Sequence, residues 1–124
     1  MKNEFVSYEQ ALALKELGFD EECFGVYYHD GQLVEQLWEK LNISKKEEPH
    51  ILAPLYQQAF RLFREKYGFI HRIDKELRGN LPILYSSYAC NSETDFRTTQ
   101  SLSYEEAELA CLNKLIEIVK NNKV

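Results

Sequence analysis

Leu102-Ser103-Tyr104-Glu105-Glu106-Ala107 carries the pattern of a helix start, and Val6-Ser7-Tyr8-Glu9-Gln10-Ala11 repeats this pattern near the other end of the chain. Each copy has an apolar residue, then Ser, then two residues, then Glu or Gln. This pattern is typical of a capping box: the serine accepts from the N3 amide, and the N3 side chain reaches back to the serine amide. The preceding apolar residue can also contact N4. We therefore expect one helix to begin after Ser7 and another after Ser103.

The residues after the first cap predict a helix, a short strand and a tight turn. The helix should end at Leu17-Gly18, where Gly supplies the left-handed C′ residue. Residues 23–28 are aromatic and β-branched, and Asp30-Gly31 after them is typical of a hairpin turn. Residues 32–41 fit either a helical stripe or a returning strand, and we favour a short strand that passes into a helical turn.

The middle of the chain predicts a loop and a long helix. Residues 42–50 are polar and include Pro49, which indicates a loop. A second helix should run from about Ala53 to Tyr67, with Pro54 in its first turn and an apolar arc of about 160°. Gly68 should end it.

Three strand candidates follow in quick succession, at residues 69–73, 83–89 and 96–100, and the second capped helix then runs to about Asn121. The predicted fold is α+β: an N-terminal helix and β-hairpin, then a helix, a three-stranded antiparallel meander and a helix. We expect one domain over residues 1–124, with residues 7–50 as its first part and residues 51–124 as the helix–meander–helix unit.

The order of elements from Ala53 to Asn121 resembles a double-stranded-RNA-binding domain. The resemblance implies two helices on one face of the meander and a cationic start to the last helix, where such domains grip phosphates. Here Glu105, Glu106 and Glu108 stand where cations would be. Carboxylates suit a helix N-terminus but repel RNA. The sequence therefore favours this fold and disfavours this function.

Four segments resemble uncharacterised small proteins from phages and mobile elements of gut bacteria: residues 11–20, 52–61, 104–112 and 114–120. They cover about a third of the chain. No activity is assigned to that group, so the resemblance implies kinship without a function.

Composition indicates a globular cytoplasmic protein. The chain has 124 residues and sixteen aromatics, counting Tyr, Phe and Trp together, and no apolar run near the roughly 20 residues that span a bilayer. No apolar segment follows residues 1–4, so we expect no signal peptide. Cys23, Cys90 and Cys111 are odd in number and far apart, which indicates reduced and mostly buried thiols.

Charge is uneven along the chain. The net charge is −5, yet residues 61–78 hold six Lys/Arg against three Asp/Glu. This basic segment is the candidate patch for a polyanion or an acidic partner, with tyrosines 85 and 88 nearby to stack on bases. Balance against the acidic N-terminal half is the simpler explanation. The residues of the patch are Arg61, Arg64, Lys66, His71, Arg72, Lys75 and Arg78.

No motif predicts catalysis, a metal or a cofactor. Histidines 29, 50 and 71 lack metal-ligand spacing, and no glycine-rich nucleotide loop is present. Cys90 with His71 is the one candidate nucleophile pair. We favour the simpler interpretation, a strand-end cysteine and a surface histidine.

The sequence therefore favours a non-enzymatic accessory protein that binds an unidentified protein partner, without a cofactor and away from membranes. The last helix has an apolar sweep of roughly 200°, wider than one sheet face needs. We expect this helix to contact the sheet and, in addition, either the first helix or a second subunit. In the second case a homodimer would form through Leu109, Leu112 and Ile116. The alternative function is nucleic-acid binding through the basic segment.

Overall fold

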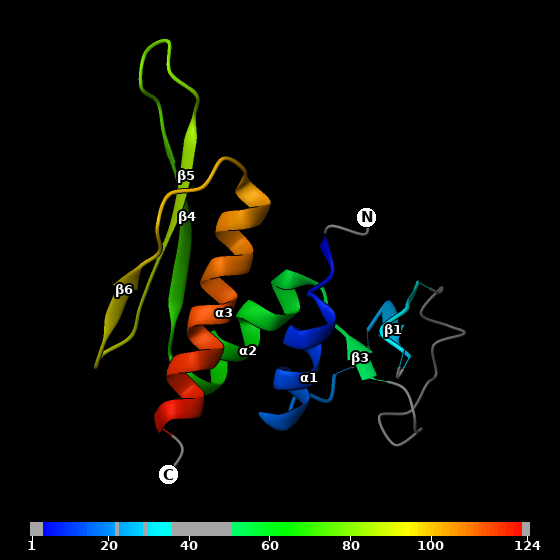
Figure 1. Cartoon of the computed structure of the whole chain (residues 1–124). Helices are drawn as coiled ribbons and strands as arrows, with labels where there is room; N and C mark the ends of the chain where they lie inside the picture. The colour runs from blue at the N-terminus through cyan, green and yellow to red at the C-terminus, as the bar shows by residue number, and fades with distance from the viewer. Residues whose placement is uncertain (1–3, 22, 29, 36–50, 123–124) are drawn as a thin grey trace. The chain divides into compact units, whose positions relative to one another are not determined.

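A computed structural model of the chain describes residues 4–21, 23–28, 30–35 and 51–122. These residues form three helices and two antiparallel three-stranded sheets, which confirms the predicted α+β class (Figure 1). The chain divides into two compact units, residues 1–59 and 60–124, and each is described by itself. The predicted single domain stays a prediction. The predicted loop at 42–50 and the helical turn expected before it lie outside the described residues.

The first unit begins with helix α1 (Tyr8–Glu16), capped as predicted. The Gln10 amide donates to Ser7 Oγ at 3.2 Å, and the Ser7 amide donates to Gln10 Oε1 at 3.0 Å, which completes the capping box. Gly18, with φ 95°, ends the helix, and the Phe19 amide donates back to the Leu14 carbonyl at 2.9 Å. Local chemistry alone therefore places both ends of α1.

Replacing Ser7 by alanine is expected to lower the free energy of unfolding by about 1 kcal/mol, because the Gln10 amide loses its acceptor. Chemical denaturation of the variant and the wild-type chain measures this difference. Glu9→Ala, two residues further along the chain on the exposed side of the helix, is the matched control. A Ser7 variant as stable as the control would contradict a role for the cap.

The first sheet has the order β2-β1-β3 and consists of β1 (Gly25–Tyr27), β2 (Leu33–Glu35) and β3 (Ile51–Ala53). The Asp30-Gly31 turn joins β1 to β2 as predicted, with the Gly31 amide donating to the Tyr28 carbonyl at 2.8 Å. Strand β2 confirms the short strand favoured for this segment. At Gly25, an added Cβ would lie 2.8 Å from the Phe5 ring, so close packing requires glycine there.

Strand β3 corrects the predicted start of the second helix. Residues 51–53 pair with β1, and α2 runs from Tyr56 to Tyr67 rather than from Ala53. Strand pairing occupies the backbone groups that a first helical turn would need, and the Gln58 side chain accepts from the Leu55 amide at 3.0 Å. The predicted end is confirmed, because Gly68 follows with φ 75°.

The second unit contains the rest of α2, strands β4 (Ile70–Glu76), β5 (Leu84–Cys90) and β6 (Asp95–Arg97), and helix α3 (Tyr104–Asn122). The strands form the predicted antiparallel meander in the order β4-β5-β6. Helix α3 lies along one face of this sheet, and the β4–β5 hairpin extends beyond the first turn of α3 (Figure 1). Strand β4 is longer than predicted, since it continues through the charged residues 74–76.

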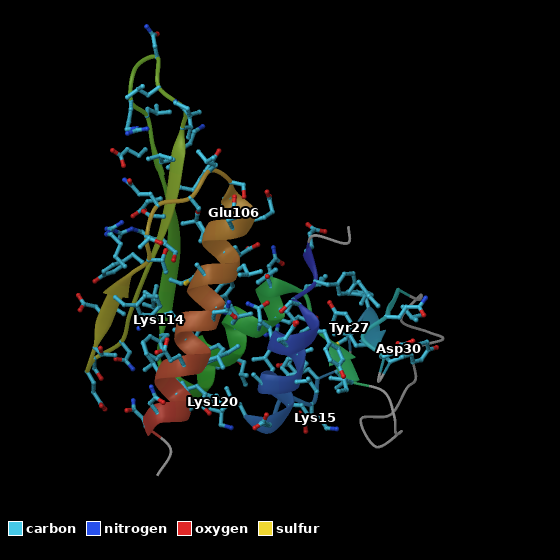
Figure 2. All side chains as sticks on the ribbon, viewed as in Figure 1. Lys15, Tyr27, Asp30, Glu106, Lys114 and Lys120 are labelled. Atoms are coloured by element: carbon cyan, nitrogen blue, oxygen red, sulfur yellow. The ribbon has the colours of Figure 1, made fainter. Side chains whose placement is uncertain are left out.

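The start of α3 differs in detail from the predicted capping box. The Glu106 amide donates to Ser103 Oγ at 3.1 Å as expected, but the Glu106 carboxylate accepts from the Ser103 hydroxyl at 3.0 Å rather than from its amide. Leu102 is 69% exposed, so no buried apolar pair supports this helix start. Figure 2 shows Glu106 in the first turn and Lys120 in the last, an arrangement that suits the helix dipole.

Candidate functional site

The two faces of the β4–β5–β6 sheet differ in burial and in polarity. Side chains of Ser87 and Ala89 are fully buried on the face that α3 covers. Because side chains alternate along a strand, the residues between them project from the opposite face. We call this opposite face the open face. It carries polar, charged and aromatic side chains.

A row of three side chains crosses the centre of the open face. Register places Arg72 of β4 opposite Tyr88 of β5, and Tyr88 opposite Arg97 of β6. The guanidinium carbon of Arg72 lies 4.5 Å from the centre of the Tyr88 ring, and that of Arg97 lies 5.5 Å from it. Both distances are within the range of cation–π attraction. The row therefore presents a tyrosine flanked by two arginines.

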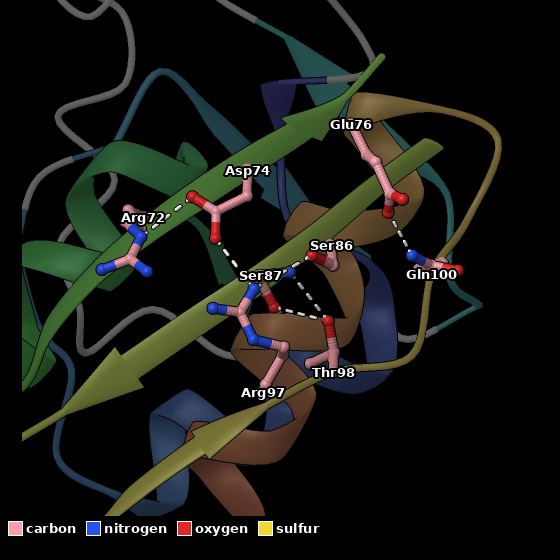
Figure 3. Close-up of polar contacts among 8 residues, drawn as sticks. All are labelled: Arg72, Asp74, Glu76, Ser86, Ser87, Arg97, Thr98 and Gln100. Carbon is pink, nitrogen blue, oxygen red and sulfur yellow. Dashed lines mark hydrogen bonds and ion pairs between the residues drawn. The ribbon is translucent and has the colours of Figure 1, made fainter. Parts of the chain in front are cut away.

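Asp74 holds both arginines in place (Figure 3). Its carboxylate accepts from Arg72 Nε at 2.9 Å and from Arg97 Nη1 at 2.8 Å. Hydrogen bonds from Arg97 and Arg72, in that order of effect, lower the pKa of Asp74 below its ordinary value. The pair of arginines thus shares one carboxylate, which offsets half of their charge.

Tyr88 also interacts with an acidic side chain, because its hydroxyl donates to Asp95 Oδ2 at 3.4 Å. A hydrogen bond with Cys90 is the main cause that raises the pKa of Tyr88, and the Asp95 carboxylate acts in the same direction. Glu76, further along β4, accepts from the Gln100 side chain (Figure 3). The open face is therefore close to neutral rather than basic.

Contacts on the covered side attach the end of β6 to the sheet. The Thr98 hydroxyl lies 2.7 Å from Ser87 Oγ and accepts from the Ser87 amide at 3.0 Å. The Thr98 amide donates to the Ser87 carbonyl at 2.9 Å. These bonds fix the strand that positions Arg97.

The tip of the β4–β5 hairpin exposes aliphatic side chains. We call residues 77–83 the hairpin arm. The Leu81 amide donates to the Arg78 carbonyl at 3.0 Å and closes the turn of this arm. Leu77 is 72% exposed and Leu81 is 58% exposed, and Ile83 is also exposed. Aliphatic groups gathered in so short an exposed segment are typical of an interaction site.

The structure distributes the predicted basic patch over several surfaces. Arg72 lies on the open face, whereas His71 and Lys75 alternate to the covered face. Arg78 lies in the hairpin arm. The remaining residues of the patch are on α2, where all are exposed: Arg61, Arg64 and Lys66. Only Arg72 belongs to the central row.

The candidate nucleophile pair is not assembled. His71 is opposite Ala89, and Cys90 is opposite Ile70, so the two side chains project from opposite faces of the sheet. His71 instead stacks on Phe60 with ring centres 3.8 Å apart. Burial, and then the charge of Arg64, lower the pKa of His71. Histidine 29 and histidine 50 lie outside the described residues.

The predicted dimer residues on α3 differ in exposure. Leu112 and Ile116 are buried within the chain, and Leu109 is 40% exposed. Cys111 beside them is fully buried, as predicted for a core thiol. Most of the wide apolar arc of α3 is therefore buried by packing within the chain.

The described residues contain neither a candidate metal site nor a membrane-spanning helix. In residues 4–21, 23–28, 30–35 and 51–122, no group of three or more His, Cys, Asp or Glu side chains is arranged to hold a metal ion. Within the same residues, every helix is too short or too polar to cross a membrane.

Part of the central row was predictable from the sequence. Tyr85 and Tyr88 were both expected beside the basic segment, but Tyr85 lies on the covered side, where its ring meets Tyr104 edge-on at 6.3 Å. Arg97 was not predicted to join the row, because it lies 19 residues beyond Arg78 in the chain. Strand alternation could have separated Tyr85 from Tyr88. The β5–β6 register needed to place Arg97 depends on the turn between these strands.

Comparison of the chain with protein-family models, with curated proteins and with solved structures gives no significant match. The resemblance to small phage and mobile-element proteins therefore stays a prediction.

Proposed function

We propose that this chain is a non-enzymatic accessory protein that binds another protein through the open face and the hairpin arm. The observation that carries the proposal is the row of Arg72, Tyr88 and Arg97 on a sheet face that no helix of the second unit's described residues covers. Tyrosine and arginine are the residues that most often dominate the binding energy of protein interfaces.

Charge balance supports a protein partner over a polyanion. Asp74 bonds both arginines, and Glu76 and Asp95 share their face. A surface that binds nucleic acid gains most of its affinity from cations on phosphates. Neutral, mixed polar and apolar surfaces are instead typical of protein interfaces.

The hairpin arm would supply the apolar part of the interface. Leu77 and Leu81 are mostly exposed, so a partner that covers them removes aliphatic surface from water. Burial of a leucine side chain contributes about 1.5–3 kcal/mol. The proposal also assigns the protein to the cytoplasm, where its free cysteines stay reduced.

Affinity capture from a bacterial lysate tests this function with variants of each surface. We expect Tyr88→Ala to weaken retention of the partner by more than tenfold, as loss of an interface hot spot does. We expect Leu77→Ser with Leu81→Ser to have an effect of similar size. Lys120→Ala, in the exposed last turn of α3, is the control and should retain the partner fully. Equal retention by all three variants would refute the proposal.

The second candidate function is nucleic-acid binding, favoured by a tyrosine placed between two arginines, since bases stack on both groups. Nuclease treatment in parallel distinguishes the two functions. Captured material that disappears with nuclease, and with Arg72→Glu plus Arg97→Glu, would support nucleic acid. A partner that survives nuclease and depends on Tyr88 would support protein binding.

A further inference from the structure

Strand β4 forms one edge of the second sheet. It pairs only with β5, and no other described strand lies along its far side. The strand is seven residues long, and an edge of this length presents a row of unpaired amides and carbonyls that can template another strand.

Hydrogen bonds on the far side of β5 identify which β4 groups point outward. Tyr85 and Ser101 exchange both backbone bonds, at 2.8 and 2.7 Å, so the backbone groups of Tyr85 point away from β4. Ser87 likewise accepts from the Thr98 amide. The residues of β5 that alternate with Tyr85 and Ser87 therefore form the backbone hydrogen bonds to β4. Their register partners on β4 include Arg72 and Asp74. Because alternation continues across the ladder, the outward groups of β4 belong to His71, Ile73 and Lys75.

The charge pattern of this edge is self-complementary about Ile73. Arg72 precedes Ile73 and Asp74 follows it, so antiparallel pairing with an identical strand places Arg72 opposite Asp74 twice. We propose that two copies of this chain pair antiparallel through their β4 edges, with the two-fold axis at Ile73, and form a continuous six-stranded sheet.

Backbone geometry and charge select this register over its neighbours. A shift of one residue would place the outward-pointing amides and carbonyls of one strand opposite residues whose backbone groups point toward β5. The hydrogen bonds between the two copies would then be lost. A shift of two residues would place Arg72 opposite Arg72, or Asp74 opposite Asp74, and like charges directly opposite are destabilising. In the proposed register the outward residues face each other: Ile73 meets Ile73, and His71 meets Lys75.

The remaining cross-strand pair is compatible with this register. His71 is half-buried against Phe60, and burial lowers its pKa, so its neutral form faces Lys75 of the second copy. On the open face, Arg72 of one copy would lie beside Asp74 of the other. The two central rows would then belong to one surface. Arg72 belongs both to this pairing and to the central row, whereas Ile73 belongs to the pairing alone. Cross-linking at Ile73 therefore tests the pairing separately from the proposed function.

Cysteine cross-linking tests the register in a Cys90→Ser background, with copper–phenanthroline as oxidant. Two copies of Ile73→Cys would have Cα atoms about 5.5 Å apart, within disulfide range, and should form a covalent dimer. Lys75→Cys is the matched control on the same edge. Its two cysteines would lie roughly 13 Å apart, four residues along the strand, and should stay monomeric. Equal cross-linking of both variants would refute the register.

Charge exchange provides a second test that leaves Ile73 intact. We expect sedimentation equilibrium to show a wild-type dimer that weakens on the order of tenfold in Arg72→Asp and in Asp74→Arg, since each creates two like-charge pairs. The variant that combines Arg72→Asp with Asp74→Arg should dimerise again, because the two opposite charges have only exchanged positions on each strand. A wild-type chain that stays monomeric at every soluble concentration would overturn the proposal. So would single variants that dimerise as tightly as the wild type.

Discussion

Replacing Leu115 by alanine is expected to lower the free energy of unfolding of the second unit by about 2–5 kcal/mol. Leu115 is fully buried on α3, so truncation removes apolar contacts and leaves a cavity. The cost depends on how far the surrounding side chains can relax. It is a large share of the roughly 5–15 kcal/mol that stabilises a typical domain.

Leu109→Ala is the matched control for this prediction, since it makes the same change on the same helix. Leu109 is 40% exposed, and its truncation should cost less than about 1 kcal/mol. Denaturant unfolding followed by circular dichroism measures both variants. Equal losses would mean that Leu109 is buried in solution, as the predicted dimer through α3 requires. The comparison therefore tests that dimer as well as the core.

The free energy of unfolding should fall steeply above pH 9. Burial raises the pKa of the Cys23 thiol to about 12 and that of the Cys111 thiol to about 11. In the unfolded chain the same thiols titrate near their ordinary value, 9.0. Between these values the folded state keeps protons that the unfolded state has released, so rising pH favours unfolding. The stabilisation is complete below about pH 9 and is lost as pH rises through the folded pKa values.

The size of this effect follows from about 1.4 kcal/mol per pH unit for each retained proton. By pH 11 each thiol should cost the folded state about 2–3 kcal/mol. Denaturant unfolding at a series of pH values measures the slope. Cys111→Ala and Cys23→Ala each remove one thiol and should each make the slope shallower, whatever their own cost at neutral pH. A double variant with the wild-type slope would contradict the assignment to these thiols.

Local sequence signals predicted most helix ends and turns of the described residues. Ser7, Gly18 and Gly68 mark the expected helix boundaries, since a cap or a left-handed residue acts within a few positions of the chain. The meander after Gly68 was also predicted, although β4 extends through Asp74-Lys75-Glu76. Charged residues are poor strand signals, and their place in β4 depends on pairing with β5.

Strand β3 could not be predicted in the same way. Residues 51–53 precede Pro54 and are apolar, which fits a helix start as well as a strand. Their pairing with β1 joins segments about 25 residues apart, a contact that no local pattern encodes.

Local sequence patterns were enough to predict the α+β class, the capped starts of α1 and α3, and a buried Cys111. These follow from hydrogen bonds and apolar periodicity within single segments, which act before any two segments meet. The pairing of the strands was needed to show that Arg72, Tyr88 and Arg97 form one row, and that His71 and Cys90 lie on opposite faces. Strand register decides both, because a shift of one residue would move every side chain of a strand to the other face.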